Sequence, residues 1–377
     1  MLRAASPFAT RTIGWVTVVL SLLAALAGCA RVNPYFDPAK PHHTPEGFRN
    51  TYGPAGGKPI SDLLRWYVDR TSNGLPPPPS KHVNGYDFPL ARPDLEWLRS
   101  NRTEPSVTWI SHATLLIQIG GINILTDPHF SERAFAVQWW GPRRRVPLPV
   151  RLDELPPIDL VVISHSHYDH LDRETVLALN AQAGGPPLFL VPLGIERWLA
   201  GQGIRHARAL DWWDREAFRG LDIHFVPAQH WSARTPFDRN STLWGGWVIR
   251  SPAFSFYFAG DTGYSRDFHD IGARFGGFDV AAIPVGAYLP RWFMKDQHVD
   301  PDEAVQIHLD VKARLSIGIH WGSFELTDEP LDAPIGDLAR ARAKHGVNDE
   351  AFVLLRHGET RRFDSRPAAR RPLSESR

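Results

Sequence analysis

The stretch Leu160-Val-Val-Ile-Ser-His-Ser-His-Tyr-Asp-His170 decides the fold and the chemistry that this sequence predicts. Its first four residues are apolar and mostly β-branched, which predicts a buried strand. Four residues of types that bind transition metals follow within one short loop: His165, His167, Asp169 and His170. In an extended loop His165 and His167 point the same way and can share one metal, whereas Asp169 and His170 can reach a second. A coincidental histidine cluster on a solvated loop is the alternative, but it does not explain the apolar strand before it.

Three more candidate ligands follow apolar runs farther along the chain: His230, Asp261 and His320. Loops at the C-terminal ends of strands converge on one site, so we expect these side chains to meet the histidine loop. We assign three histidines to a first metal: His165, His167 and His230. We assign Asp169, His170 and His320 to a second metal, with Asp261 as the bridge. Seven protein ligands leave room for a bridging water, as catalytic metal sites require.

The rest of the chain beyond residue 106 alternates strand and helix signals. Apolar runs predict strands at 107–110, 114–119, 122–126, 188–191, 223–226, 247–249, 254–258, 280–283, 315–319 and 352–355. Capping residues and amphipathic spacing predict helices at 60–70, 93–100, 172–179, 194–200, 303–311 and 338–344. Many strands with interspersed helices indicate sheets covered by helices.

Composition excludes several classes of protein. The 377 residues carry 42 Lys+Arg against 41 Asp+Glu, so the net charge of +1 argues against a nucleic-acid partner. A mean hydropathy of −0.27 excludes a protein with many membrane spans. The single cysteine excludes an intramolecular disulfide and a cysteine-based zinc site, which leaves histidine and carboxylate as the metal ligands.

The spacing His165-x-His-x-Asp-His170, followed by His230, Asp261 and His320, resembles the metallo-β-lactamase superfamily. The resemblance covers about 106–360 and implies an α/β fold, an αββα sandwich of two mixed β-sheets flanked by helices. It implies two zinc ions per chain, with iron or manganese as open alternatives. It also implies that Asp127 orients a ligand histidine rather than binding metal, and that His112 supports the site. The superfamily members that use a cysteine ligand are excluded, because the chain has only Cys29.

Longer blocks resemble one branch, the N-acylphosphatidylethanolamine-hydrolysing phospholipases D. These blocks are 138–142, 154–159, 211–213, 229–231, 259–264, 286–294, 297–301 and 319–322. The resemblance implies a zinc-dependent phosphodiesterase that releases N-acylethanolamine and phosphatidate from a membrane phospholipid. The chain departs from the branch at Trp139, where a tyrosine is expected, and at Leu289, where an acidic residue is expected. Both departures concern headgroup and acyl preference.

The same resemblance suggests roles for individual residues. Asp169 and His298 are the candidate catalytic residues, with His298 as a phosphate contact or acid; a structural histidine at the entry to the following helix is the alternative. Candidate substrate-binding residues are Gln138, Trp139, Tyr168, His298 and His357. Aromatic segments that could line an apolar approach are 135–140, Trp231 and 292–293. Arg143, Arg144 and Arg145 suit anionic headgroups or form a solvated loop. Alternatives are a hydrolase of a soluble lactone or phosphodiester, and a non-catalytic envelope lipoprotein.

The N-terminus carries a targeting signal. Arg3 and Arg11 precede an uncharged run at 12–28, and Leu26-Ala-Gly-Cys29 resembles a bacterial lipobox. We therefore expect a lipoprotein signal peptide at 1–28 and a lipid anchor on Cys29, with a plain signal peptide or a short anchor helix as alternatives. We expect residues 29–105 to form a tether and a wrapping extension, and 106–377 to form the hydrolase domain. The predicted location is the bacterial cell envelope, on the periplasmic face of the outer membrane, and the branch also allows a homodimer.

Overall fold

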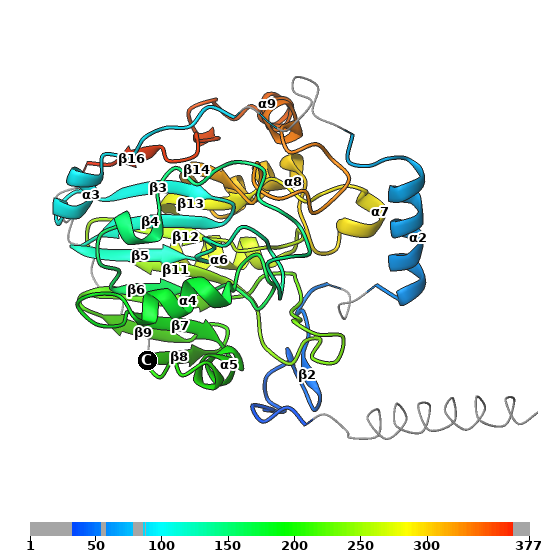
Figure 1. Cartoon of the computed structure of the whole chain (residues 1–377), viewed down its shortest axis with the longest axis horizontal. Coiled ribbons are helices and arrows are strands. Elements are labelled where there is room, and N and C mark those ends of the chain that lie inside the picture. Colours follow the sequence, from blue (N-terminus) through cyan, green and yellow to red (C-terminus); the bar gives the residue numbers. More distant parts are fainter. Residues whose placement is uncertain (1–31, 54–57, 78–85, 87, 365–377) are drawn as a thin grey trace, which may run out of the picture.

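Two seven-stranded mixed sheets form the centre of the molecule (Figure 1). The computed structural model describes residues 32–53, 58–77, 86 and 88–364. In the first sheet the strand order is β16-β3-β4-β5-β6-β7-β8. Its strands are β3 (Ser106–Ser111), β4 (Thr114–Ile119), β5 (Ile122–Thr126), β6 (Leu160–Val162), β7 (Leu188–Pro192), β8 (Ala207–Leu210) and β16 (Thr360–Arg362). Pairing is antiparallel from β16 to β5 and parallel from β5 to β8.

The second sheet has the order β15-β14-β13-β12-β11-β10-β9. Its strands are β9 (Arg215–Phe218), β10 (Leu221–Val226), β11 (Gly246–Arg250), β12 (Ser255–Phe258), β13 (Phe278–Pro284), β14 (Ala313–Ile319) and β15 (Phe352–Val353). Pairing is antiparallel from β9 to β12 and parallel from β12 to β15.

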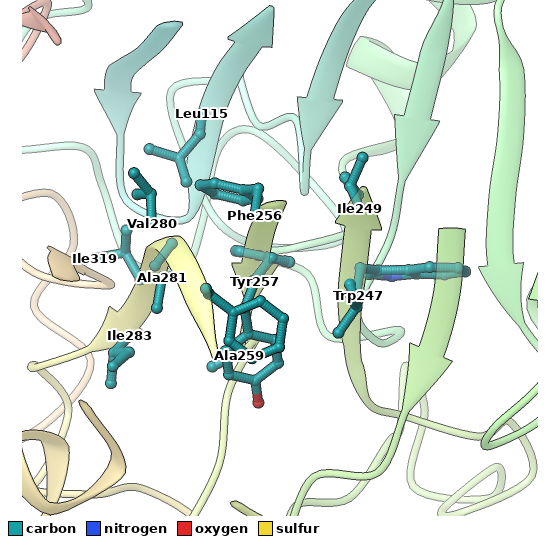
Figure 2. Packing of buried hydrophobic residues seen from close by; sticks show 14 of the residues in the cluster. Leu115, Trp247, Ile249, Phe256, Tyr257, Ala259, Val280, Ala281, Ile283 and Ile319 are labelled. Carbon is teal, nitrogen blue, oxygen red and sulfur yellow. The ribbon is translucent and has the colours of Figure 1, made fainter. Parts of the chain in front are cut away.

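The main core lies between the two sheets. Because strand side chains alternate between faces, Leu115 and Ile117 of β4 join this inner core, whereas Leu116 faces the outer layer. Leu115 lies close to Phe256 of β12 in Figure 2. Nearly every residue of the central strands is buried, which explains why they read as continuous apolar runs rather than alternating ones.

Helices cover the outer faces of both sheets. The outer core of the first sheet contains residues of α3 (Leu95–Ser100), α4 (Arg173–Asn180) and α5 (Ile195–Gly201). On the second sheet lie α6 (Asp267–Phe275), α8 (Pro301–Asp310) and α9 (Ala333–His345). The prediction of an αββα sandwich is therefore confirmed, and every strand expected from an apolar run is present.

The sequence did not reveal three strands that lie at the edges of the sheets. These are β8, β9 and β16, with the sequences ARAL, REAF and TRR. An edge strand buries one side only, so it lacks the apolar run that marked the central strands. Two helices were also not expected: α6, and α7 (Arg291–Met294), which has only four residues.

The N-terminal segment is packed against the main domain. It contains the short hairpin β1 (His43–Thr44) and β2 (Gly47–Phe48), followed by α2 (Ile60–Ser72). We expected residues 30–59 to be a tether, but Phe48 belongs to the inner core and Asn50 is buried. The predicted signal peptide and Cys29 lie outside the described residues. Within the described part of the chain, no helix combines the length and the apolar character needed to cross a membrane.

Candidate metal centre

The first group of donors brings together three imidazoles from two sheets. His165 and His167 follow β6 of the first sheet, and His230 follows β10 of the second. His165 Nε2 lies 2.8 Å from His167 Nδ1, and His230 Nε2 lies 3.3 Å from the same atom. These are the three histidines that the sequence assigned to one metal, and their nitrogens converge on one point.

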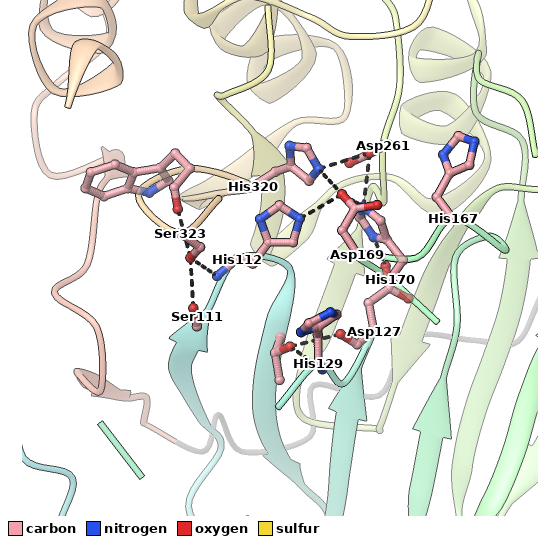
Figure 3. A network of polar contacts seen from close by, with 12 residues as sticks. Ser111, His112, Asp127, His129, His167, Asp169, His170, Asp261, His320 and Ser323 are labelled. Atoms are coloured by element: carbon pink, nitrogen blue, oxygen red, sulfur yellow. Dashed lines mark hydrogen bonds and ion pairs between the residues drawn. The ribbon is translucent and has the colours of Figure 1, made fainter. Parts of the chain in front are cut away.

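The second group combines one carboxylate with three imidazoles, those of His112, His170 and His320 (Figure 3). Asp169 Oδ2 lies 3.3 Å from His170 Nε2 and 3.2 Å from His320 Nε2. His112, expected as a supporting residue, also contacts this carboxylate, with Nε2 3.0 Å from Asp169 Oδ2. The backbone nitrogen of His320 donates to the carbonyl oxygen of His112, so β3 and β14 meet directly at this group.

Asp261 joins the two groups. Its Oδ2 lies 3.0 Å from His170 Nε2 and 3.1 Å from His320 Nε2. The same atom lies 3.9 Å from His165 Nε2 and 4.0 Å from His230 Nε2. The preceding Gly260 has a φ of +64°, and a Cβ there would lie 2.7 Å from Cβ of Ser164. Only glycine lets the Asp261 loop approach the histidine loop this closely.

The donors fit metal ions rather than hydrogen bonds alone. His167 Nε2 and Asp261 Oδ1 are buried and have no hydrogen-bond partner among the described residues. Nitrogen and carboxylate oxygen are the donors that zinc and its neighbours prefer, and the two groups supply three and four of them, with Asp261 between the two. The arrangement therefore matches a centre that holds metal, and the donors alone do not fix which metal.

Asp127 connects the ligand histidines beneath the site. Its Oδ2 accepts a hydrogen bond from His170 Nδ1 at 2.6 Å and its Oδ1 accepts one from the backbone nitrogen of Ser164 at 2.7 Å. The hydroxyl of Ser164 also contacts His165 Nδ1 at 2.9 Å. The ring of His230 is held in the same manner, with Nδ1 2.8 Å from the carbonyl oxygen of Gln297. Such partners fix the ring orientation and tautomer of metal-binding histidines.

Burial and charge divide the site into a neutral half and an ionic half. Burial, reinforced by the neighbouring imidazoles, holds the pKa of His165 and His167 well below the usual range. Burial also lowers the pKa of His230 to about 4. In the other half, burial also disfavours the protonated form of His320, but the nearby carboxylates of Asp261 and Asp169 favour it more strongly. The pKa of His320 is therefore raised to about 9. The first group is thus ready for a cation at neutral pH, whereas the second must release protons to accept one.

A cavity of about 340 Å³ opens onto both donor groups. His167, Asp169, Asp261 and His298 form its base. Its walls include the side chains of Leu63, Trp66, Trp231, Phe293, Met294 and Leu326. Two cationic side chains, Lys58 and Arg239, complete the lining. A mostly apolar pocket with cations beside a metal centre suits an anionic group attached to an apolar body.

His298 lies where a substrate above the metal centre would be in reach. Its Nδ1 lies 4.0 Å from Asp261 Oδ2 and has no hydrogen-bond partner among the described residues. Burial lowers its pKa to about 3, so the ring is neutral at physiological pH. Tyr168 also lines the cavity, and its hydroxyl donates to the carbonyl oxygen of Arg234.

Three of the expected substrate-binding residues do not line this cavity. Both ends of the Gln138 amide are bonded to the backbone of Arg133, and Gln138 faces a neighbouring cavity of about 430 Å³ on the far side of Tyr168. Trp139 is 79% exposed at the surface. His357 is buried against Trp109, with ring centroids 4.2 Å apart, because its segment returns beneath the site to form β16.

The arginine run is mainly structural. Arg144 is half-buried and donates to Ser111 and His129, whereas its neighbours Arg143 and Arg145 pair with Glu132 and Glu325. The run of three arginines does not indicate this partial burial. Nor does the sequence indicate that Lys58, Leu63 and Trp66 line the cavity, although it predicts a helix at 60–70 and aromatics there that pack.

The comparisons with known proteins agree with this geometry. The sequence model of a Beta-lactamase superfamily domain matches residues 122–321. N-acyl-phosphatidylethanolamine-hydrolyzing phospholipase D 1 of Caenorhabditis elegans is 41% identical over 267 residues, covering 67% of this chain and 74% of that protein. The mitochondrial N-acyl-phosphatidylethanolamine-hydrolyzing phospholipase D of Saccharomyces cerevisiae is 34% identical over 265 residues, covering 68% of this chain and 56% of that protein.

Among solved structures, an isothiocyanate hydrolase from Delia radicum gut bacteria superposes with a TM-score of 0.55 at 22% identity. The match covers 69% of this chain and 99% of that one, and it supports the fold alone. The family match spans the strands that precede Asp127 and the donors, namely β5, β6, β10, β12 and β14. On these grounds the chain belongs to the beta-lactamase superfamily, as a metal-dependent hydrolase of the metallo-β-lactamase fold.

Proposed function

We propose that the chain is a two-zinc phosphodiesterase of phospholipase D type that acts on membrane phospholipids. The substrate would be N-acylphosphatidylethanolamine, and the products phosphatidate and N-acylethanolamine. The observation that carries this proposal is the cavity, in which apolar walls and two cations meet a pair of metal-binding groups. The 41% identity to the N-acyl-phosphatidylethanolamine-hydrolyzing phospholipase D 1 of Caenorhabditis elegans supports it.

The residues divide the work of hydrolysis between them. Divalent ions held by the two donor groups would supply Lewis acidity and lower the pKa of a water molecule. Lys58 and Arg239 offer positive charge to the phosphodiester. His298, neutral and with a free ring nitrogen, is placed to hydrogen-bond a phosphoryl or leaving oxygen. Water adds to phosphorus, the bond from phosphorus to the ethanolamine oxygen breaks, and that oxygen leaves with a proton as the alcohol.

The surface beside the cavity favours a lipid substrate over a soluble one. Helix α2 buries none of its side chains completely, and Leu63 and Trp66 line the cavity from one side of it. Its other side exposes a row of apolar residues: Ile60, Leu64, Tyr67 and Val68. Trp66 stacks on Phe293 of the cavity wall, with centroids 5.0 Å apart, so this helix forms part of the rim. An apolar row continuous with the cavity gives acyl chains a path from a bilayer to the metal centre.

We propose, further, that Cys29 anchors the chain by a lipid at the bacterial envelope and that the enzyme works there, with a homodimer as one possible assembly. Mass spectrometry of the mature N-terminus would test the anchor. Acylated Cys29 in the wild type and its loss in Cys29→Ser would support it. An unmodified Cys29 in the membrane fraction would contradict it.

The deciding experiment compares three substrates on the purified full-length chain loaded with zinc. These are N-acylphosphatidylethanolamine and phosphatidylethanolamine in mixed micelles, and bis(p-nitrophenyl) phosphate in solution. In ¹⁸O-labelled water, attack at phosphorus places the label in phosphatidate. Labelled phosphatidate that is absent with Asp169→Asn would support the proposal. Hydrolysis of the soluble diester alone would favour a soluble phosphodiester, and metal binding without any hydrolysis would favour a binding protein.

A further inference from the structure

The N-terminal segment 33–50 reaches the backbone of a metal-binding histidine. The side-chain Nδ2 of Asn50 donates to the carbonyl oxygen of His230 at 3.1 Å. The backbone nitrogen of His230 donates to Oδ1 of the same amide at 3.1 Å. One asparagine therefore satisfies both backbone polar groups of one ligand residue, as a neighbouring strand would. An amide can do this because it carries one donor and one acceptor side by side.

Asn50 is itself fixed in place. Its exposed fraction is 7%, and its Oδ1 accepts a second hydrogen bond from Nε1 of the buried Trp244 at 3.0 Å. The segment before it is held by Asp211, a buried carboxylate that contacts His42 at 2.7 Å and His43 at 3.0 Å. Because both its side-chain amide and the segment before it are held in this way, Asn50 cannot move without disturbing several buried hydrogen bonds.

The same part of the chain also supports the ring side of His230. Gly53 lies against Gln229, where a Cβ would approach the side-chain Oε1 to 2.3 Å. Farther on, Lys58 forms an ion pair with Asp296 at 2.6 Å, next to Gln297, whose carbonyl oxygen holds the His230 ring. Asn50, Gly53 and Lys58 thus contact both the backbone of His230 and the neighbourhood of the group that orients its imidazole.

We propose that Asn50 is a positioning residue for the metal centre, acting through His230 on the ion held by His165, His167 and His230. The matched superfamily domain spans 122–321, so this support comes from outside that domain. Of the three histidines in this group, His230 alone comes from the second sheet. A shift of its backbone would therefore remove one of the three nitrogens from the ion. Supporting residues of this kind alter metal affinity by about 10–100-fold.

The test measures zinc affinity by chelator competition and the visible spectrum of the cobalt-loaded full-length chain. The variants are Asn50→Ala and the isosteric Asn50→Asp, which keeps the acceptor but lacks the donor. The matched control is Asn101→Ala, because Asn101 is also 7% exposed and hydrogen-bonded but lies away from the metal centre. We expect both Asn50 variants to bind one of the two ions about 10–100-fold more weakly, with an altered cobalt spectrum. We expect the control to lower only the melting temperature.

Either of two results would overturn this inference. The first is a folded Asn50 variant, Ala or Asp, that binds both ions with the affinity of the wild type. The second is an equal loss of affinity in Asn101→Ala, which would show a general effect of stability. The inference rests on the two-ion centre proposed above, and a wild-type chain that binds fewer than two ions would overturn that centre as well.

Discussion

Asp127 Oδ2 lies 2.6 Å from Nδ1 of His170, and neither side chain has any exposed surface. The contact ties β5, which precedes Asp127, to the histidine loop that follows β6. It leaves Nε2 of His170 facing Asp169 and Asp261. The carboxylate therefore selects which nitrogen of His170 is available to a metal.

We predict that Asp127→Asn binds zinc about 10–100-fold more weakly and loses activity in proportion. The amide matches the carboxylate in shape, but it is neutral and one of its ends donates rather than accepts. Metal content after dialysis against a graded chelator would measure the effect. Asp267→Asn is the control, since Asp267 is also buried but accepts its hydrogen bond from Ser265 and not from a metal-binding histidine. Equal metal retention in the two variants would contradict the role given to Asp127.

We predict that His298→Gln keeps both metal ions but lowers kcat by about 10²-fold or more. The ring has no hydrogen-bond partner among the described residues, so its loss removes a contact to the substrate without disturbing the donors. Zinc stoichiometry and steady-state kinetics on micelles would separate the two effects. A loss of metal with kcat per bound ion unchanged would place His298 among the ligands instead.

We predict that Leu64→Ser with Val68→Ser slows hydrolysis of vesicle-bound substrate about 30-fold or more through KM. Leu64 and Val68 are exposed, so each can enter a lipid surface. Transfer of each apolar side chain from water contributes about 1–2 kcal/mol to the binding free energy, and serine loses this contribution. Hydrolysis of a soluble diester should stay unchanged. The matched control is Leu309→Ser with Ile335→Ser, two exposed apolar residues that lie on α8 and on its neighbour α9. Equal slowing by both pairs would remove α2 from substrate access.

We predict that His357→Phe reduces the loss of stability at acidic pH. Burial lowers the pKa of His357 to about 3, against about 6.5 when the chain is unfolded. Below pH 6.5 the unfolded chain takes up a proton that the folded chain refuses, so the free energy of unfolding falls as the pH falls towards 3. The difference is about 1.4 kcal/mol per pH unit.

Urea unfolding at pH 7 and pH 5 would measure this contribution. The wild type should lose about 2 kcal/mol more than His357→Phe over that interval. His269→Phe is the control, because His269 has a side chain that is 62% exposed. A wild type and a variant that lose the same free energy would place the origin of the acid sensitivity elsewhere.

The central strands and the donors could be predicted from sequence because both leave local signals. Each donor follows an apolar run, and the residue types identify the chemistry without knowledge of the fold. The edge strands β8, β9 and β16 leave no such signal, since only one side of each is buried. The family resemblance added Asp127, whose role depends on a contact across two loops.

Other features depend on contacts between distant parts of the chain. Nothing local to Asn50 indicates that it meets His230, which lies 180 positions later. Arg144 stands in a run of three arginines that looks solvated, yet it is half-buried, and Ser111, His129 and Ser131 accept hydrogen bonds from it. The substrate-binding roles of Gln138 and His357 rested on resemblance, and neither side chain lines the cavity at the metal centre. Trp139 was expected at the groove or the membrane, and it lies exposed at the surface.

The donors come from both sheets. His165, His167, Asp169 and His170 follow β6, whereas His230, Asp261 and His320 follow strands of the opposite sheet. Before the sheets dock, the first sheet offers an incomplete donor set and the second offers scattered single donors. The amount of metal bound per newly synthesised chain would therefore report the fraction of chains in which the two sheets have docked. Metal binding in the cell would stabilise the molecules whose sheets have docked, because only these present the complete donor set. Incompletely folded molecules would stay metal-free and more susceptible to proteolysis.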